Sequence, residues 1–119
     1  MENSIFVKIL GDSSKSRILE YLITTRELQV HQSDVLRNSK ASKITVMKIW
    51  KDMIDNKLLL YERTIGRAKL YSLNIKDLRI KKLIEFYNVC LKKEAEIGFI
   101  ENHDLEADFR GDKLVIEKD

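Results

Sequence analysis

Residues 42–74 read SKITVMKIWKDMIDNKLLLYERTIGRAKLYSLN, and the apolar spacing changes partway along this stretch. Up to about Asn56, apolar residues recur three and four positions apart, which predicts a helix with one buried side. Ser42 stands before that helix as an N-cap. Residues 58–64 and 69–73 are rich in strand formers, and the turn between them contains a glycine, so a β-hairpin is predicted. The buried side of the helix is expected to hold Val46, Ile49, Trp50, Met53 and Ile54.

The residues in front of this stretch predict a shorter helix beside the first one. Ser33 can cap a short helix, and the polar residues 37–40 suit a turn. Two helices joined by a tight polar turn, the second one longer, form a helix-turn-helix pattern. The sequence also predicts a helix over 4–10 that stops at Gly11, a helix from Ser13 to about Thr24, and a very short strand over 27–30.

A long helix is predicted from about Lys76 to Gly98. Its apolar residues are spread too widely for one narrow seam, which indicates a second contact surface besides its own core. Cys90 lies in this helix, and it could bridge two chains or sense oxidation, although a buried and inert thiol explains it more simply. We expect the second surface to pair two chains through Leu83, Ile84, Tyr87 and Leu91.

Residues 99–119 differ in composition from the rest of the chain, with seven acidic residues against three basic ones. Apolar residues alternate on both sides of Gly111 and Asp112, which predicts a small hairpin. A disordered acidic tail is the alternative interpretation.

The charge of the chain is concentrated in one region. The net charge of the whole chain is +3, but residues 1–98 carry +7 and residues 40–69 alone carry +5, because the last 21 residues carry −4. Basic residues on the second helix of a helix-turn-helix and on the hairpin beside it match the footprint of a DNA duplex. The alternative is an ordinary solvated surface. On the helix, one face holds Lys43, Met47 and Lys51, with Thr45 and Lys48 beside it, and Arg63 and Arg67 lie near the hairpin tip.

Composition and motifs exclude several classes of protein. A single cysteine allows neither a disulfide framework nor a cysteine-based zinc site within one chain. The sequence has no apolar run of about 18 residues and no secretory signal pattern, so we expect no membrane span and a cytoplasmic location. We find no phosphate-binding glycine loop, no metal-binding histidine pair and no nucleophile beside a base, so neither an enzyme nor a cofactor is expected. His31 and His103 are isolated, and no metal site is predicted.

Several motifs occur in a characteristic order. They are ILGDS at 9–13, RILEYL at 17–22, SDVL at 33–36, ITV at 44–46, IWKDM at 49–53, LL at 58–59 and GRAKLYSLN at 66–74. Over residues 4–75 the sequence thereby resembles an archaeal-type winged helix-turn-helix transcriptional regulator of the ArsR/MarR-like winged-helix superfamily.

The resemblance implies a fold that is mainly α-helical with a small β-wing (α+β), in which a winged helix-turn-helix domain is followed by a C-terminal helix and a short β-hairpin. The chain would then divide into residues 1–75, which bind DNA, residues 76–98, which pair two chains, and the acidic residues 99–119. Residues 27–34 also resemble the metal-sensing box of the ArsR family, but Gln29 and His31 stand where its cysteines would be, so metal sensing is not expected.

By position, the resemblance also implies which side chains contact double-stranded DNA. The start of the helix that begins after Ser42 would read base edges, and the wing would hold the phosphate backbone or the minor groove. Ser42 could equally act only as the cap of its own helix. The implied groove residues are Ser42, Lys43, Thr45, Met47 and Lys48, and the implied backbone residues are Arg63, Arg67 and Lys69.

The leading hypothesis is therefore a sequence-specific DNA-binding transcriptional regulator that acts as a homodimer. One rival is a winged-helix protein-interaction module of transcription or replication machinery, which does not require the cationic helix and wing. Another is an architectural or plasmid-partition DNA binder, which would make the same contacts. The acidic segment 99–119 could repel DNA or dock on a partner protein.

Overall fold

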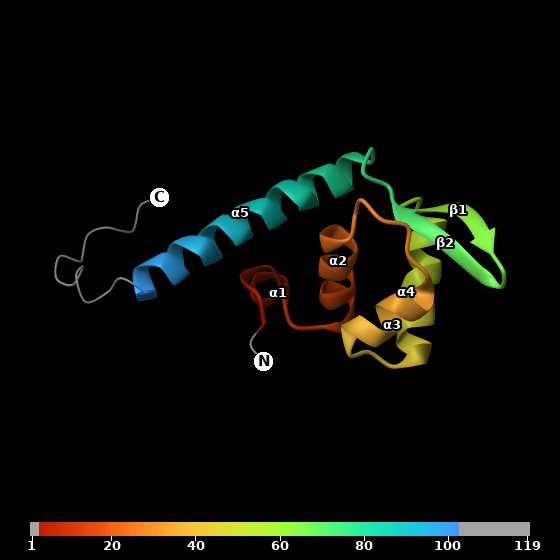
Figure 1. The fold of residues 1–119 in the computed structure, drawn as a ribbon, viewed down its shortest axis with the longest axis horizontal. Helices are drawn as coiled ribbons and strands as arrows, with labels where there is room; N and C mark the ends of the chain where they lie inside the picture. Colours follow the sequence, from red (N-terminus) through yellow and green to blue (C-terminus); the bar gives the residue numbers. More distant parts are fainter. Residues whose placement is uncertain (1–2, 103–119) are drawn as a thin grey trace.

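The computed structural model describes residues 3–102. This part of the chain is mostly helical, with a two-stranded antiparallel hairpin and a long last helix, as the sequence predicts. Helices α2, α3 and α4 and the hairpin form the body, while α5 lies along it and projects beyond it (Figure 1). The elements are α1 (Ile5–Leu10), α2 (Ser14–Thr24), α3 (Gln32–Ser39), α4 (Lys43–Asp55), β1 (Leu59–Ile65), β2 (Ala68–Leu73) and α5 (Leu78–Asn102).

Serine side chains begin three of the helices. Ser4 accepts a hydrogen bond from the Val7 amide at the start of α1, and Ser13 accepts one from the Ser16 amide at the start of α2. Ser42 accepts one from the Thr45 amide at the start of α4, which confirms its predicted capping role. Each such bond satisfies a backbone donor that has no partner within its helix, and a cap of this kind contributes about 1 kcal/mol.

Helix α3 begins earlier than the sequence indicates. Its N-cap is His31, not Ser33: the His31 Nδ1 atom accepts a hydrogen bond from the Ser33 amide at 3.1 Å. In return the Asp34 carboxylate accepts the His31 amide at 2.9 Å, which completes a reciprocal capping box. Preference rules favour serine at a cap, but here the imidazole nitrogen performs the same task two residues earlier.

The hairpin forms where it is predicted, within a residue or two at each end. Leu59 pairs with Leu73 at its base and Ile65 with Ala68 at its tip, so the turn consists of Gly66 and Arg67. Gly66 has φ +62°, a left-handed conformation that glycine adopts without steric cost. A bulge lies between Tyr61 and Arg63 and shifts the register of the outer half of the wing.

The strand predicted over 27–30 is reduced to one bridge. Val30 and Tyr71 exchange both backbone hydrogen bonds, at 2.8 and 2.9 Å. The residues before Val30 are held in turns instead, because the Leu28 amide bonds to the Thr25 carbonyl and the Arg26 amide to the Ile23 carbonyl. The bridge nevertheless fixes the path by which the chain approaches α3.

A single apolar core joins all the elements, and α5 takes part in it. Ile80, Tyr87 and Cys90 of α5 are buried in the same cluster as Phe6 of α1 and Ile18 of α2. Trp50 belongs to this core too, as the helical spacing predicts. The long helix is therefore packed on the body through one side of its first half.

Helix α5 differs from the prediction at both ends. It runs from Leu78 to Asn102, so residues 99–102 are helical. Gly98 lies inside the helix, where it costs about 1 kcal/mol relative to alanine but does not interrupt the backbone hydrogen bonds. The small hairpin predicted on both sides of Gly111 and Asp112 lies outside the described residues, as does the alternative of a disordered acidic tail.

Asp77 is an acidic residue that lies directly before the first residue of α5. Its carboxylate accepts the Arg79 amide at 2.8 Å and forms an ion pair with the Arg79 guanidinium, also at 2.8 Å. The hydrogen bond from the Arg79 side chain lowers the pKa of Asp77 to about 2, from an ordinary value of 3.8. The ionised carboxylate is thus favoured in the folded chain, and its stabilising effect is present above pH 3.8.

Asp77→Asn should isolate the contribution of this charge to the stability of the fold, because asparagine can still cap the helix but carries no ionised group. Wild type should be the more stable protein at neutral pH, and its advantage should disappear as the pH falls from about 4 to about 2. Urea unfolding of both proteins at a series of pH values measures the difference. A difference that stays constant down to pH 2 would contradict the expected titration.

Candidate nucleic-acid interface

The side of α4 that faces away from the core is cationic. Val46, Trp50 and Met53 are buried on one side, while Lys43, Lys48 and Lys51 are exposed. Met47 is also outside the core, with 48% of its surface exposed. Of the helix residues predicted to contact DNA, these four are therefore accessible to a partner.

Ser42 and Thr45 are occupied by their own helix. The Ser42 hydroxyl accepts the Thr45 amide and donates to the Thr45 Oγ1 atom at 2.9 Å. Thr45 is only half-exposed, because it lies at the edge of the buried side of α4. A base contact by either residue stays a prediction, and it would have to compete with this local pair.

Lys51 lies one turn before the end of α4 and has an acidic neighbour. Its ammonium group donates to the Asp55 carboxylate at 2.9 Å, and this hydrogen bond raises the pKa of Lys51. The pair is exposed, so bulk water and salt weaken the attraction between the two charges. Lys43 and Lys48 have no such ion pair in the described part of the chain.

All three predicted cations of the wing are exposed, but their side chains have different neighbours. Arg67 follows Gly66 in the tip, and Lys69 lies on β2 just behind it. Arg63, on the bulged part of β1, donates from Nε to the Gln29 side-chain oxygen at 2.9 Å. Arg63 is therefore linked to the loop before α3, whereas Arg67 and Lys69 face α4.

Helix α4 and the wing are separated by a groove that brings several predicted residues together. Lys51, Arg67 and Lys69 line it with Met47, so residues from helix and wing share one surface. The groove is about 460 Å³ in volume, and its floor includes the aromatic rings of Trp50 and Tyr71. A second hollow continues past His31 to Lys43, at the other end of α4. The complete lining of the first groove is His31, Gln32, Met47, Trp50, Lys51, Ile54, Arg67, Lys69 and Tyr71.

A row of aromatic rings fixes the wing relative to α4. Trp50 meets Tyr71 edge to face with ring centres 5.6 Å apart, and Tyr71 meets Tyr61 at 5.7 Å. Such contacts add about 0.5–1.5 kcal/mol each beyond simple burial. The core residue Trp50 therefore supports the wing that carries these cations.

Two residues of this surface were not identified from the sequence. His31 lines both hollows, and because its Nδ1 atom accepts the Ser33 amide, a neutral ring carries its proton on Nε2. Ile44 lies in the first turn of α4 and has 67% of its surface exposed. An isoleucine in an amphipathic helix is normally expected in the core, so only the spacing from Val46 and Trp50 could have indicated its outward position.

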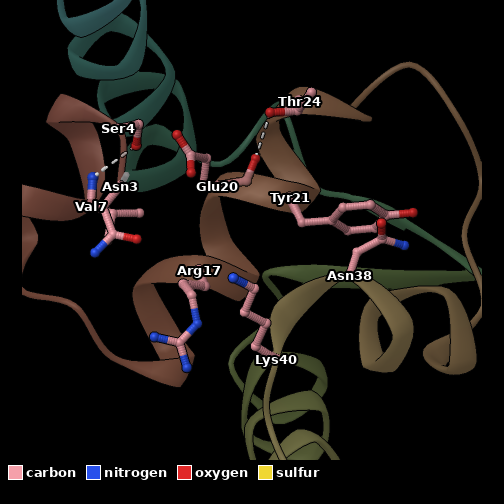
Figure 2. Close-up of a pocket in the computed structure, with 9 residues that line it drawn as sticks. All are labelled: Asn3, Ser4, Val7, Arg17, Glu20, Tyr21, Thr24, Asn38 and Lys40. Atoms are coloured by element: carbon pink, nitrogen blue, oxygen red, sulfur yellow. Dashed lines mark hydrogen bonds between the residues drawn. The ribbon is translucent and has the colours of Figure 1, made fainter. Parts of the chain in front are cut away.

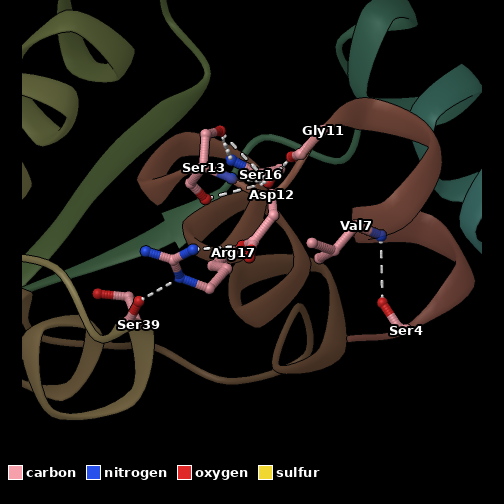
Figure 3. A network of polar contacts seen from close by, with 8 residues as sticks. All are labelled: Ser4, Val7, Gly11, Asp12, Ser13, Ser16, Arg17 and Ser39. Carbon is pink, nitrogen blue, oxygen red and sulfur yellow. Dashed lines mark hydrogen bonds and ion pairs between the residues drawn. The ribbon is translucent and has the colours of Figure 1, made fainter. Parts of the chain in front are cut away.

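The turn before α4 is fastened to the first half of the chain by Arg17 (Figure 3). Its Nε atom donates to the Ser39 carbonyl oxygen at 2.7 Å, and its guanidinium also pairs with Asp12. Hydrogen bonds from Asn3 and Arg17 lower the pKa of Asp12, so the carboxylate is ionised in this pair. Arg17 thus joins the connection between α1 and α2 to the end of α3.

A further hollow lies between α1, α2 and this turn (Figure 2). Arg17 and Lys40 line it together with the acidic side chain of Glu20 and the ring of Tyr21. Its cations and its carboxylate offset each other, and Arg17 is already engaged by Ser39 and Asp12. It lies away from the groove between α4 and the wing, and we assign it no part in the interface.

The four residues predicted to pair two chains are not equivalent in the structure. Tyr87 is buried in the core of its own chain, where its ring meets Phe6 edge to face and its hydroxyl is 3.0 Å from the Thr24 hydroxyl. Leu83 and Ile84 are half-buried against the same core, and only Leu91 is exposed. Apolar spacing reports burial without saying which chain supplies the partner, and Tyr87 is already covered within its own chain.

Cys90, the side chains of metal-binding types and the lengths of the helices are three further features of the described residues. Cys90 is buried, and burial, followed by the nearby Glu94 and Glu20, raises the pKa of its thiol, which keeps the thiol protonated. Among residues 3–102, no three side chains of the metal-binding types gather in one place. No helix in that range is both long and apolar enough to cross a membrane.

The arrangement of α2, α3, α4 and the hairpin is a winged helix-turn-helix, the fold found in MarR-family regulators. Among solved structures, the chain is similar to MepR, a transcription regulator of the Staphylococcus aureus multidrug efflux pump MepA, at 18% identity and a TM-score of 0.57 over 87% of this chain and 78% of that one. It is also similar to Lactococcus lactis ZitR in complex with DNA, at 18% identity and a TM-score of 0.56 over 92% of this chain and 79% of that one. No protein-family model and no curated protein sequence matches the chain.

Proposed function

We propose that this protein is a sequence-specific DNA-binding transcriptional regulator that acts as a homodimer. In this proposal α4 enters the major groove and the wing lies on the backbone or in the minor groove. We also propose that the protein is related to the archaeal-type regulators of the ArsR/MarR-like superfamily and that it is located in the cytoplasm.

The observation that carries the proposal is the shared groove between α4 and the wing. Lys51 from the helix and Arg67 and Lys69 from the wing line it together, and Lys43 and Lys48 extend the positive surface along α4. A row of exposed cations along a helix and the adjacent wing attracts the phosphate groups of a DNA duplex. The similarity in fold to ZitR, which was solved in complex with DNA, supports DNA as the partner.

Selection from a pool of random duplexes tests the proposal directly. The protein should enrich a short motif with two inverted half-sites about 10 base pairs apart, as two copies of one recognition helix require. Enrichment of no motif, with binding to all duplexes, would favour an architectural DNA binder. Absence of DNA binding at low salt would favour the protein-interaction module and reject the proposal.

Pairing of two chains is proposed through the side of α5 that carries Ile84 and Leu91. These residues are seven positions apart and therefore lie on one side of the helix, whereas Val89 lies on nearly the opposite side. Leu91 is 44% exposed, so it can change without disturbing the core. Leu83 and Ile84 pack against that core, and substitutions there would confound association with folding.

Leu91→Asp should convert the dimer into a monomer, because it places a charge in an apolar contact. Sedimentation velocity measures the change, and circular dichroism shows whether the fold is retained. Val89→Asp is the matched control, since Val89 is 56% exposed on the other side and its replacement should leave the dimer intact. A dimer that survives Leu91→Asp but not Val89→Asp would move the pairing surface to the opposite side.

A further inference from the structure

Ile44 is an apolar side chain in the middle of a cationic surface. It is 67% exposed, whereas Val46 and Met53 of the same helix are completely buried. It lies outside the cluster of core residues and outside the set packed against that cluster. The exposure of Ile44 therefore has no explanation in the packing of the described chain.

The position of Ile44 on α4 places it at the start of the outward stripe. Lys48 follows one turn later and Lys51 almost one turn after that, so the three side chains lie along one side of the helix. Met47, which is also exposed, borders Ile44 on the same surface. The outward stripe is thus apolar in the first turn of α4 and basic in the turns that follow.

We propose that Ile44 contacts the 5-methyl group of a thymine in the major groove and so sets a base preference at one position of each half-site. The inference rests on the proposed function and adds a residue that reads sequence. Residues in the first turns of a recognition helix reach base edges, and the thymine methyl is the apolar group that the major groove presents. The surrounding lysines favour a polyanion over an apolar protein surface as the partner.

Ile44 is better placed for this contact than Thr45, one of the residues that the resemblance implies in the groove. Thr45 is half-buried, and its hydroxyl oxygen is held by Ser42 at 2.9 Å. Ile44 has no polar group to satisfy, and most of its surface is exposed. The apolar contact with the thymine methyl group is accordingly assigned to Ile44.

The experiment uses the duplex that the wild-type protein selects from random sequence. Each thymine of one half-site is replaced in turn by uracil, which removes the methyl group and keeps the hydrogen-bonding pattern. At one position this should weaken wild-type binding about fourfold, as expected for one buried methyl group. Ile44→Ala should bind the thymine duplex about as weakly as wild type binds the uracil duplex, and it should no longer distinguish the two.

Two variants make the result specific. Ile44→Val keeps a branched apolar side chain and should retain the preference for thymine over uracil. Ile75→Ala removes another exposed isoleucine, which follows β2 outside the interface, and should bind both duplexes as wild type does. Circular dichroism of all three variants checks that the helices are intact.

The proposal is overturned if no uracil replacement weakens binding, or if Ile44→Ala still distinguishes thymine from uracil at the sensitive position. Either result leaves the proposed function standing, provided that a motif is selected. If the wild-type protein selects no motif, both the base preference and sequence-specific regulation are rejected.

Discussion

Replacing Trp50 with alanine is expected to lower the free energy of unfolding by about 3–5 kcal/mol, the usual cost of removing a large aromatic side chain from a core. Trp50 is 4% exposed and lies where α4 meets the wing. Its ring contacts Tyr71, which contacts Tyr61 in turn, so the substitution removes both a core side chain and the support of the wing.

Guanidinium unfolding followed by circular dichroism measures this loss, because Trp50 is the only tryptophan and its fluorescence disappears with it. Trp50→Phe is the control: a smaller ring can still meet Tyr71, so the loss should be clearly smaller. A loss below about 1 kcal/mol for Trp50→Ala would show that the ring is not part of the core. The wing would then have to be held mainly by its other contacts with the body, such as the Val30–Tyr71 bridge and the Arg63–Gln29 hydrogen bond.

Replacing Lys48, Arg67 and Lys69 together with alanine should reduce affinity for DNA of any sequence. Each phosphate contact contributes about −0.9 to the slope of log K against log salt, so the slope should become shallower by about 2.7. If the triple variant and wild type bind DNA equally at 1 M salt, the same relation predicts that the variant binds about 500-fold more weakly than wild type at 0.1 M. The stability of the fold should be unchanged, since all three side chains are exposed.

Titration of a labelled duplex at several salt concentrations provides both quantities. The matched control replaces Lys76, in the turn before α5, and Lys81 and Lys82 in the first turns of α5, which are also exposed. This control removes the same net charge, so it separates contact at the groove from the overall charge of the protein. Equal losses in the two triple variants would mean that no defined surface holds the duplex.

Local patterns were sufficient for most of the secondary structure. Ser42 as a cap, the apolar side of α4 and the glycine-containing turn of the wing all depend on residues within a few positions of one another. Interactions over such short spans are encoded in the sequence itself. The start of α3 at His31 was missed because imidazole is an uncommon capping group.

The candidate interface could be predicted only in outline. The excess of positive charge over residues 40–69 points to α4 and the wing, which form the candidate interface, because charge can be counted along the chain. It does not reveal that Lys51 pairs with Asp55, that Arg63 turns toward Gln29 or that His31 lies between the two hollows. Those contacts join residues far apart in sequence or depend on side-chain conformation.

The sequence by itself thus determined the helix-turn-helix, the wing and the sign of the charge they carry. The tertiary structure decided which face of each helix is free. Tyr87 and Ile44 illustrate the difference, since both are apolar residues in helices, yet Tyr87 is buried against Phe6 and Ile44 is exposed among lysines. Apolar spacing measures how much of a helix can be buried, but the neighbouring elements determine which residues are covered.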